Sequence, residues 1–216
     1  MTDVIITVGL IISAGRGAQE ITMPPPEDFA PLQVDVRLFT WDDPKPIDCE
    51  EIIDEALRMR EAGIERIALI GSSKGVPVAQ LAVAACPDLF NGGYLAVSGA
   101  GGPHWGLEAF PDSVRTPVLQ MRGGRERGRF AGLMSIIDRR IASAGGAAKL
   151  RVYAGEKHGF INRSRAAQTH LVTFFEWALF GAEVPGWWGE GYGREDRPRA
   201  AALEAGGDGA GDGKTV

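Results

Sequence analysis

Short apolar runs alternate along most of the chain with longer segments in which apolar residues recur at helical spacing. The runs are rich in β-branched residues, as expected of parallel strands that are buried on both faces. They predict strands at residues 4–13, 34–41, 66–70, 94–98, 117–121 and 150–153. The segments between them predict helices at about residues 48–63, 74–86, 130–144 and 164–180.

Residues that favour helix ends stand where these helices begin and stop. Asp48 and Glu51 have the spacing of a capping box at the start of the first helix, and Gly63 is placed to end it. Either Ser164 or Asn162 is positioned to cap the last helix. These signals support the boundaries that the apolar periodicity predicts.

Strands that alternate with helices through short connections predict an α/β fold, with a doubly wound, mostly parallel sheet of about six strands. We expect one domain over residues 1–183. The pattern dissolves from Val184 onward, so residues 184–216 are expected to form a C-terminal extension. Within it, residues 199–216 are rich in Ala, Gly and Asp, so the extension is predicted to be disordered from about residue 199.

The composition narrows the range of functions. A formal net charge of −5, with both signs mixed along the chain, lacks the clustered basic face of a nucleic-acid-binding protein. Cys49 and Cys86 are far apart without metal-ligand neighbours, which favours buried or half-buried thiols in a reducing compartment. The first apolar run is too short to span a bilayer, and an acid precedes it, so we expect a cytoplasmic protein with no membrane partner.

The most informative stretch is Gly71-Ser72-Ser73-Lys74-Gly75, which joins a predicted strand directly to a predicted helix. Gly-x-Ser-x-Gly in that setting is the pattern of a nucleophile elbow, which makes Ser73 the candidate nucleophile. The spacing does not fit a phosphate-binding loop, and Gly15-Arg16-Gly17 lacks the third glycine of a dinucleotide fingerprint. We therefore expect no cofactor and no metal.

A serine nucleophile needs a base, and the chain has three histidines. His158 follows the last predicted strand, at the carboxyl edge of the sheet where the elbow also lies, and is the candidate base. His104 lies in a Gly-rich loop as a substrate contact or a plain loop residue. His170 falls inside the last helix, where a structural role is expected.

The base in turn needs an acid to orient it. Glu126 follows the fifth predicted strand and gives the chain order Ser73, Glu126, His158 that a nucleophile elbow requires. Its arginine neighbours should keep it ionised. The alternative is a solvated charge in an Arg-rich loop, and Glu156 and Asp112 are weaker candidates for the acid.

Backbone N–H groups must stabilise the oxyanion. The Lys74 N–H at the start of the elbow helix is one candidate, and Gly15 in the loop after the first strand is the second, unless Gly15 only serves a turn. Candidate substrate contacts come from the loops after the first and fourth strands: Arg16, His104 and Trp105. The bases near this edge could attract an anionic substrate or simply be solvated: Arg16, Lys74, Arg122 and Arg125.

At these residues the chain resembles the α/β-hydrolase superfamily, over roughly residues 4–180. His158-Gly159-Phe160 is similar to the dienelactone hydrolase and prolyl-oligopeptidase-like branches, and Ser73-Lys74-Gly75 resembles the elbow of acyl-CoA thioesterases and their acyltransferase relatives. The resemblance implies a covalent acyl-enzyme on Ser73 that water releases.

The chain also departs from this family. It starts at what would be the third strand, Ala14-Gly15 replaces the His-Gly pair of the oxyanion loop, and the acid is Glu rather than the commoner Asp. The connection from Ser98 to Thr116 is too short for a cap domain. These differences concern the acid and the second oxyanion donor and leave the elbow intact.

We therefore expect a serine esterase or thioesterase with a Ser-His-Glu triad, acting on a small-molecule ester or thioester. An acyltransferase would use the same acyl-enzyme and pass the acyl group to an amine or alcohol. A non-hydrolytic binding protein of the same fold is the third reading. The sequence selects neither the acyl group nor the leaving group, and it does not indicate an oligomeric state.

Overall fold

A computed structural model describes residues 7–15, 33–102, 105–108, 110–126 and 129–189 of the chain. These residues form a six-stranded, wholly parallel sheet with the strand order β2-β1-β3-β4-β5-β6. The strands are β1 (Thr7–Gly15), β2 (Gln33–Trp41), β3 (Ile67–Ser72), β4 (Tyr94–Val97), β5 (Val118–Gly123) and β6 (Ala148–Tyr153). The predicted α/β class and the six predicted strands are confirmed.

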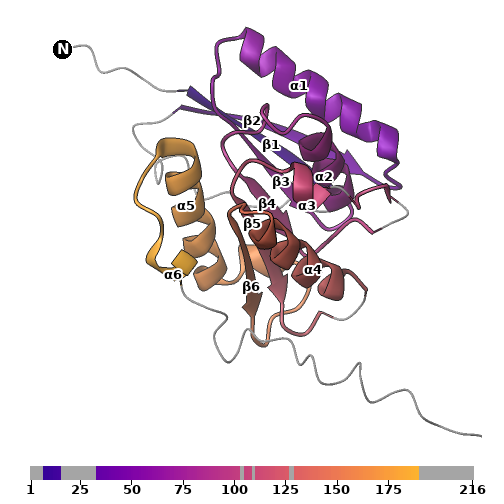
Figure 1. Cartoon of the computed structure of the whole chain (residues 1–216), viewed down its shortest axis with the longest axis vertical. Coiled ribbons are helices and arrows are strands. Elements are labelled where there is room, and N and C mark those ends of the chain that lie inside the picture. The colour runs from indigo at the N-terminus through magenta and orange to yellow at the C-terminus, as the bar shows by residue number, and fades with distance from the viewer. Residues whose placement is uncertain (1–6, 16–32, 103–104, 109, 127–128, 190–216) are drawn as a thin grey trace, which may run out of the picture.

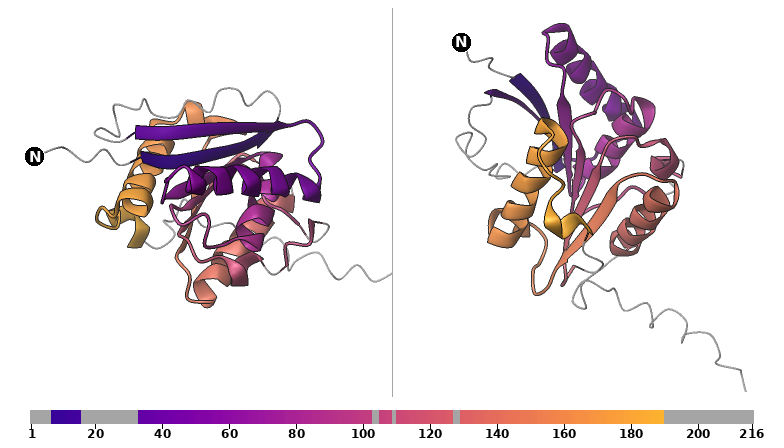
Figure 2. Two further views of the ribbon diagram at one scale, coloured as in Figure 1. Left: turned by 90° about the horizontal axis from the view of Figure 1, so that it is seen from above. Right: turned by 60° about the vertical axis from the view of Figure 1, so that its left-hand side comes forward.

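Helices cover both faces of the sheet (Figures 1 and 2). One face packs against α1 (Cys49–Glu61), α2 (Gly75–Ala85), α3 (Phe110–Ser113) and α4 (Arg129–Ser143). The other face packs against α5 (Arg165–Phe180), with the short α6 (Gly186–Gly189) beside it. Two short 3-10 helices, Pro46–Asp48 and Phe160–Asn162, precede α1 and α5. Two separate apolar cores result, one on each side of the sheet.

The helix ends agree with the sequence in part. Ser164 caps α5 by accepting a hydrogen bond from the Ala167 N–H, and Gly63, at a φ of +88°, follows α1. The predicted capping box of α1 is wrong, because Asp48 makes no side-chain cap there. Its carboxylate instead accepts the Lys45 N–H at 2.7 Å, within the 3-10 turn that precedes the helix.

The remaining structural expectations concern the cysteines and the C-terminal segment. Cys49 and Cys86 are half-buried free thiols, as predicted, and burial raises the pKa of Cys49. Trp187 and Trp188 of α6 pack against α5, where the Trp188 ring stacks on Phe174 at 5.8 Å. The expected disorder from about residue 199 lies outside the described residues. None of the described helices is both long enough and apolar enough to cross a bilayer.

Candidate active site

Ser73 occupies a sharp turn between β3 and α2. Its φ of +51° is a left-handed conformation that non-glycine residues seldom adopt, and such strain concentrates at functional sites. The turn is held by two backbone hydrogen bonds, from the Ser73 N–H to Val97 O at 2.9 Å and from the Val76 N–H to Ser73 O at 3.2 Å. The strand, the strained serine and the immediate helix together form the predicted elbow.

The glycine after the elbow lets α2 start directly against β1. A Cβ on Gly75 would lie 2.2 Å from Ser13 O and 2.4 Å from Ala14 N, closer than any side chain can approach a backbone. Ser13 Oγ also donates to Gly75 O at 3.0 Å. The first turn of the helix is therefore fixed against the strand that ends at Gly15.

His158 lies in the loop between β6 and the Phe160–Asn162 turn. Its Nε2 is 3.0 Å from Ser73 Oγ, within hydrogen-bonding distance, although the two residues are 85 positions apart in the chain. The His158 side chain is 55% exposed, so its imidazole faces solvent. The loop continues through Gly159, whose φ of +73° suits glycine.

Glu126 lies behind His158 and is shielded from solvent. Its side chain is only 2% exposed, and its Oε1 is 3.4 Å from His158 Nδ1. The hydrogen bond that the His158 ring donates to Glu126 raises the pKa of His158 above the ordinary value of 6.5, partial burial opposes this, and the charge of Glu126 adds to the rise. The alternative in which Glu126 is a solvated surface charge does not hold, because the carboxylate is buried.

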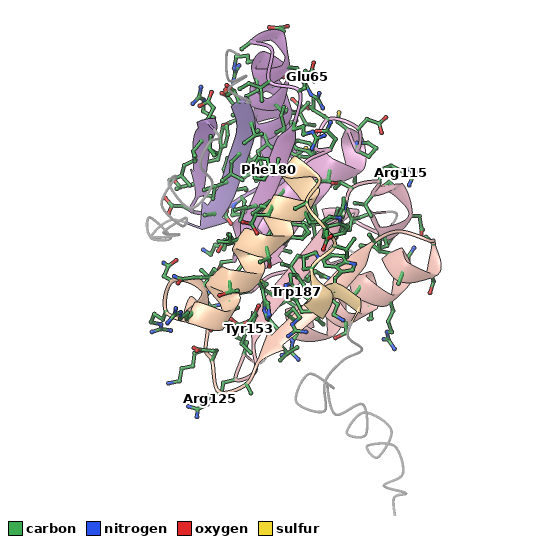
Figure 3. The ribbon with its side chains drawn as sticks, turned by 90° about the vertical axis from the view of Figure 1, so that its left-hand side faces the viewer. Glu65, Arg115, Arg125, Tyr153, Phe180 and Trp187 are labelled. Carbon is green, nitrogen blue, oxygen red and sulfur yellow. The ribbon has the colours of Figure 1, made fainter. Side chains whose placement is uncertain are left out.

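Backbone hydrogen bonds connect the loop that carries Glu126 to the loop that carries His158. Gly124 N–H donates to Tyr153 O at 2.7 Å, and Arg125 N–H donates to Glu156 O at 2.9 Å. Figure 3 shows the result: Arg125 and Tyr153 lie together at one end of the molecule, and Glu65, before the start of β3, lies at the other. The carboxyl ends of β5 and β6 thus present Glu126 and His158 at the same edge.

Two residues at this edge were not predicted in the roles that the structure gives them. Ser98 directly follows β4, is buried, and donates from its Oγ to Glu126 Oε1 at 2.5 Å. Arg122, interpreted from the sequence as a loop base, instead belongs to β5 and is 8% exposed. Burial lowers the pKa of Arg122, while the neighbouring charge of Glu126 opposes that shift.

The other candidate acids have different surroundings. Asp112 is exposed and pairs with Arg140 at 2.6 Å. Glu156 contributes its backbone to the anchoring of the Glu126 loop. Of these three carboxylates, it is Glu126 that the structure brings to the His158 ring.

The predicted oxyanion donors are neighbours. A Cβ placed on Gly15 would lie 3.8 Å from the Lys74 nitrogen. The Lys74 side chain turns away to donate from Nζ to Asp42 O at 2.8 Å.

Of the predicted substrate contacts, Trp105 packs against the core on the side of the sheet that α1 to α4 cover. Arg16 and His104, the two other predicted substrate contacts, lie outside the described residues. Among the described residues, no group of three or more His, Cys, Asp or Glu side chains could hold a metal ion.

No protein-family model and no curated protein matches the chain. Solved structures do. Est1E from Butyrivibrio proteoclasticus matches 81% of this chain and 88% of its own, at 14% identity and a TM-score of 0.59. A variant of SOBER1 from Arabidopsis thaliana matches over 80% and 100%, at 15% identity and a TM-score of 0.60. A predicted CIB-like hydrolase from Thermoplasma acidophilum matches over 77% and 85%, at 15% identity and a TM-score of 0.58.

These similarities extend over most of each chain and concern the fold. Together with the parallel sheet and the helices on both faces, they show that the chain has the α/β-hydrolase fold. They do not distinguish among the branches of proteins that share this fold. The predicted fold is confirmed, and the roles of individual residues rest on the geometry described above.

Proposed function

We propose that the protein is a serine hydrolase that cleaves a carboxylic ester or thioester of a small molecule through an acyl-enzyme on Ser73. The observation that carries the proposal is the 3.0 Å approach of His158 Nε2 to Ser73 Oγ at a strained strand-to-helix turn. A serine hydroxyl becomes a useful nucleophile when a neighbouring base accepts its proton. The fold supports the same function, since solved structures that share it include esterases.

In the proposed reaction, Ser73 Oγ attacks the substrate carbonyl while its proton passes to His158 Nε2. The buried Glu126 carboxylate accepts a hydrogen bond from the Nδ1–H of His158, which fixes the tautomer that leaves Nε2 free and stabilises the imidazolium that forms. His158 then gives its proton to the departing alcohol or thiol, and the acyl group remains on Ser73. Water attacks this ester by the same route in reverse and releases the acid.

The developing oxyanion would be stabilised at the start of α2. The N–H groups at the start of a helix have no partners within the helix, and the helix dipole favours negative charge there. We assign the Lys74 N–H as one donor. The adjacent backbone of Gly15 is the proposed second donor, which its packing against Lys74 supports.

Turnover of p-nitrophenyl acetate tests the proposal. We expect the substitution Ser73→Ala to lower kcat/KM by roughly 10³-fold or more, because the members of such a triad act as a unit. Ser72→Ala is the matched control, since it removes a hydroxyl from the adjacent residue and should retain most of the activity. Equal turnover by the wild type and Ser73→Ala, with both folded, would refute the role of Ser73. Acyl transfer is separated from hydrolysis by product analysis with an added amine or alcohol acceptor.

A further inference from the structure

We propose that Ser98 is a positioning residue that holds Glu126 toward His158; this inference rests on the proposed function. The Ser98 hydroxyl donates to Glu126 Oε1 at 2.5 Å, and the same oxygen is 3.4 Å from His158 Nδ1. Hydroxyl bonds to carboxylates of this length are charge-assisted and among the stronger hydrogen bonds in proteins. Ser98 therefore contacts the proposed acid, just as Glu126 contacts the proposed base.

The backbone of Ser98 indicates why a serine is informative at this position. Its φ is +53°, a left-handed conformation that glycine adopts freely and that is strained for other residues. Ser98 N–H donates to Met121 O at 2.8 Å, which keeps the residue in this turn. A side chain in so strained a place needs a compensating interaction, and the bond to Glu126 supplies one.

The surroundings of Glu126 make its orientation depend on this bond. Its Oε2 is buried and has no hydrogen-bond partner among the described residues, while Oε1 contacts both the Ser98 hydroxyl and His158 Nδ1. Glu126 is attached to the main chain through a flexible side chain with several rotatable bonds. Without the hydroxyl, we expect the carboxylate to move away from Nδ1, since the ring nitrogen, its remaining hydrogen-bond partner among the described residues, lies at 3.4 Å.

The elbow and Ser98 are also connected through the backbone. Ser73 N–H donates to Val97 O, directly before Ser98. A Cβ on Gly99, directly after Ser98, would lie 2.6 Å from Ser73 O. The two strained serines therefore pack side by side at the ends of β3 and β4, and Ser98 is placed to align the acid with the nucleophile.

Steady-state kinetics of Ser98→Gly and Ser98→Ala test the role. Glycine removes the hydroxyl and relieves the strain, whereas alanine removes the hydroxyl and keeps the strain. We expect kcat to fall about 10- to 100-fold in both variants with KM little changed, since the lost bond is to a charged group. A merely structural role predicts that Ser98→Gly keeps its activity. Ser135→Ala, a hydroxyl loss on α4, serves as the neutral control.

A double-mutant comparison shows whether Ser98 acts through the acid. In a Glu126→Ala background, Ser98→Gly should lower kcat no further. An additional loss equal to that in the wild type would overturn the proposal, because Ser98 would then act independently of Glu126.

Titration of His158 by NMR gives a readout that needs no turnover. We expect Ser98→Gly to lower the pKa of His158 toward its ordinary value, as the carboxylate that raises it moves away. An unchanged or higher pKa would contradict the positioning role. A wild type without esterase activity would refute the proposed function, while the His158 titration would still decide whether Ser98 holds Glu126 against the ring.

Discussion

Glu126 and His158 differ sharply in their exposure to solvent. The Glu126 side chain is 2% exposed and that of His158 is 55% exposed. A charge shielded from water acts on its neighbour through a lower effective dielectric than a solvated charge does. The buried carboxylate can therefore favour the protonated ring strongly while the opposite edge of the ring stays open to Ser73 and to substrate.

The pH dependence of kcat/KM follows from this arrangement. His158 must be neutral to accept the Ser73 proton, so activity should rise with pH through the His158 pKa. Because Glu126 raises that pKa, the midpoint of the acid limb is expected above the ordinary 6.5. Glu126→Gln removes the charge, so it should shift the limb to lower pH and reduce kcat.

The control for this measurement is Glu156→Gln, which alters a carboxylate two residues from His158 and should leave the limb in place. A wild-type midpoint at or below 6.5, or a limb that Glu126→Gln does not move, would contradict the role assigned to Glu126. All three profiles should be measured as kcat/KM on p-nitrophenyl acetate, because the pH dependence of kcat/KM reports the ionisation of the free enzyme.

At the scale of elements, the site depends on how closely α2 packs against β1. Gly75 is the position that permits this contact, since its neighbours are the backbone atoms of Ser13 and Ala14. Backbone cannot move aside as a flexible side chain can. The strand and helix must therefore separate to admit any larger residue, and Ser73 would move with them.

We expect Gly75→Ala to lower the free energy of unfolding by about 2 kcal/mol or more and to reduce esterase activity, through overpacking against β1. Gly132→Ala is the matched control. Gly132 lies on the exposed side of α4 with nothing within 4 Å of a Cβ, so alanine there should stabilise the protein by up to about 1 kcal/mol. Denaturant unfolding of both variants checks the prediction, and equal stabilities would contradict it.

The strands and the elbow could be predicted because their signals are local. A strand buried on both faces needs an apolar run, and a nucleophile elbow needs small residues around its serine. Residues 66–75 show both patterns, so the strand and the turn could be predicted from this stretch alone. Ser98 could not be identified in this way. Its significance comes from a φ of +53° and from a hydrogen bond to a residue 28 positions later, neither of which leaves a pattern in the sequence.

The start of α1 shows that a local sequence signal can also mislead. Asp48 and Glu51 have the spacing of a capping box, but Asp48 belongs to a preceding 3-10 turn that uses its carboxylate to bind Lys45 N–H. The interpretation of Arg122 as a loop residue is wrong because β5 continues past its predicted end at Met121 and includes Arg122. The spacing of residues suggests which contacts are possible. Where the neighbouring helix or strand begins and ends determines which of these contacts form.

At the scale of the whole molecule, the parallel sheet is what assembles the site. All six strands end at the same edge, so residues that follow β3, β5 and β6 meet there despite their distance in sequence. Ser73, Glu126 and His158 follow β3, β5 and β6, so they lie along this edge in the same order as in the chain. The topology by itself favours this assignment, and the distances of 3.0 and 3.4 Å are consistent with it.

The central claim, that Ser73 is a nucleophile activated by His158, is tested most directly by mass spectrometry after treatment with a fluorophosphonate. Such a reagent phosphonylates an activated serine and loses fluoride. We predict one adduct per chain, which peptide mapping places on Ser73, and its slow formation in His158→Ala. An adduct on another residue, or no adduct on a folded and soluble wild type, would contradict the claim.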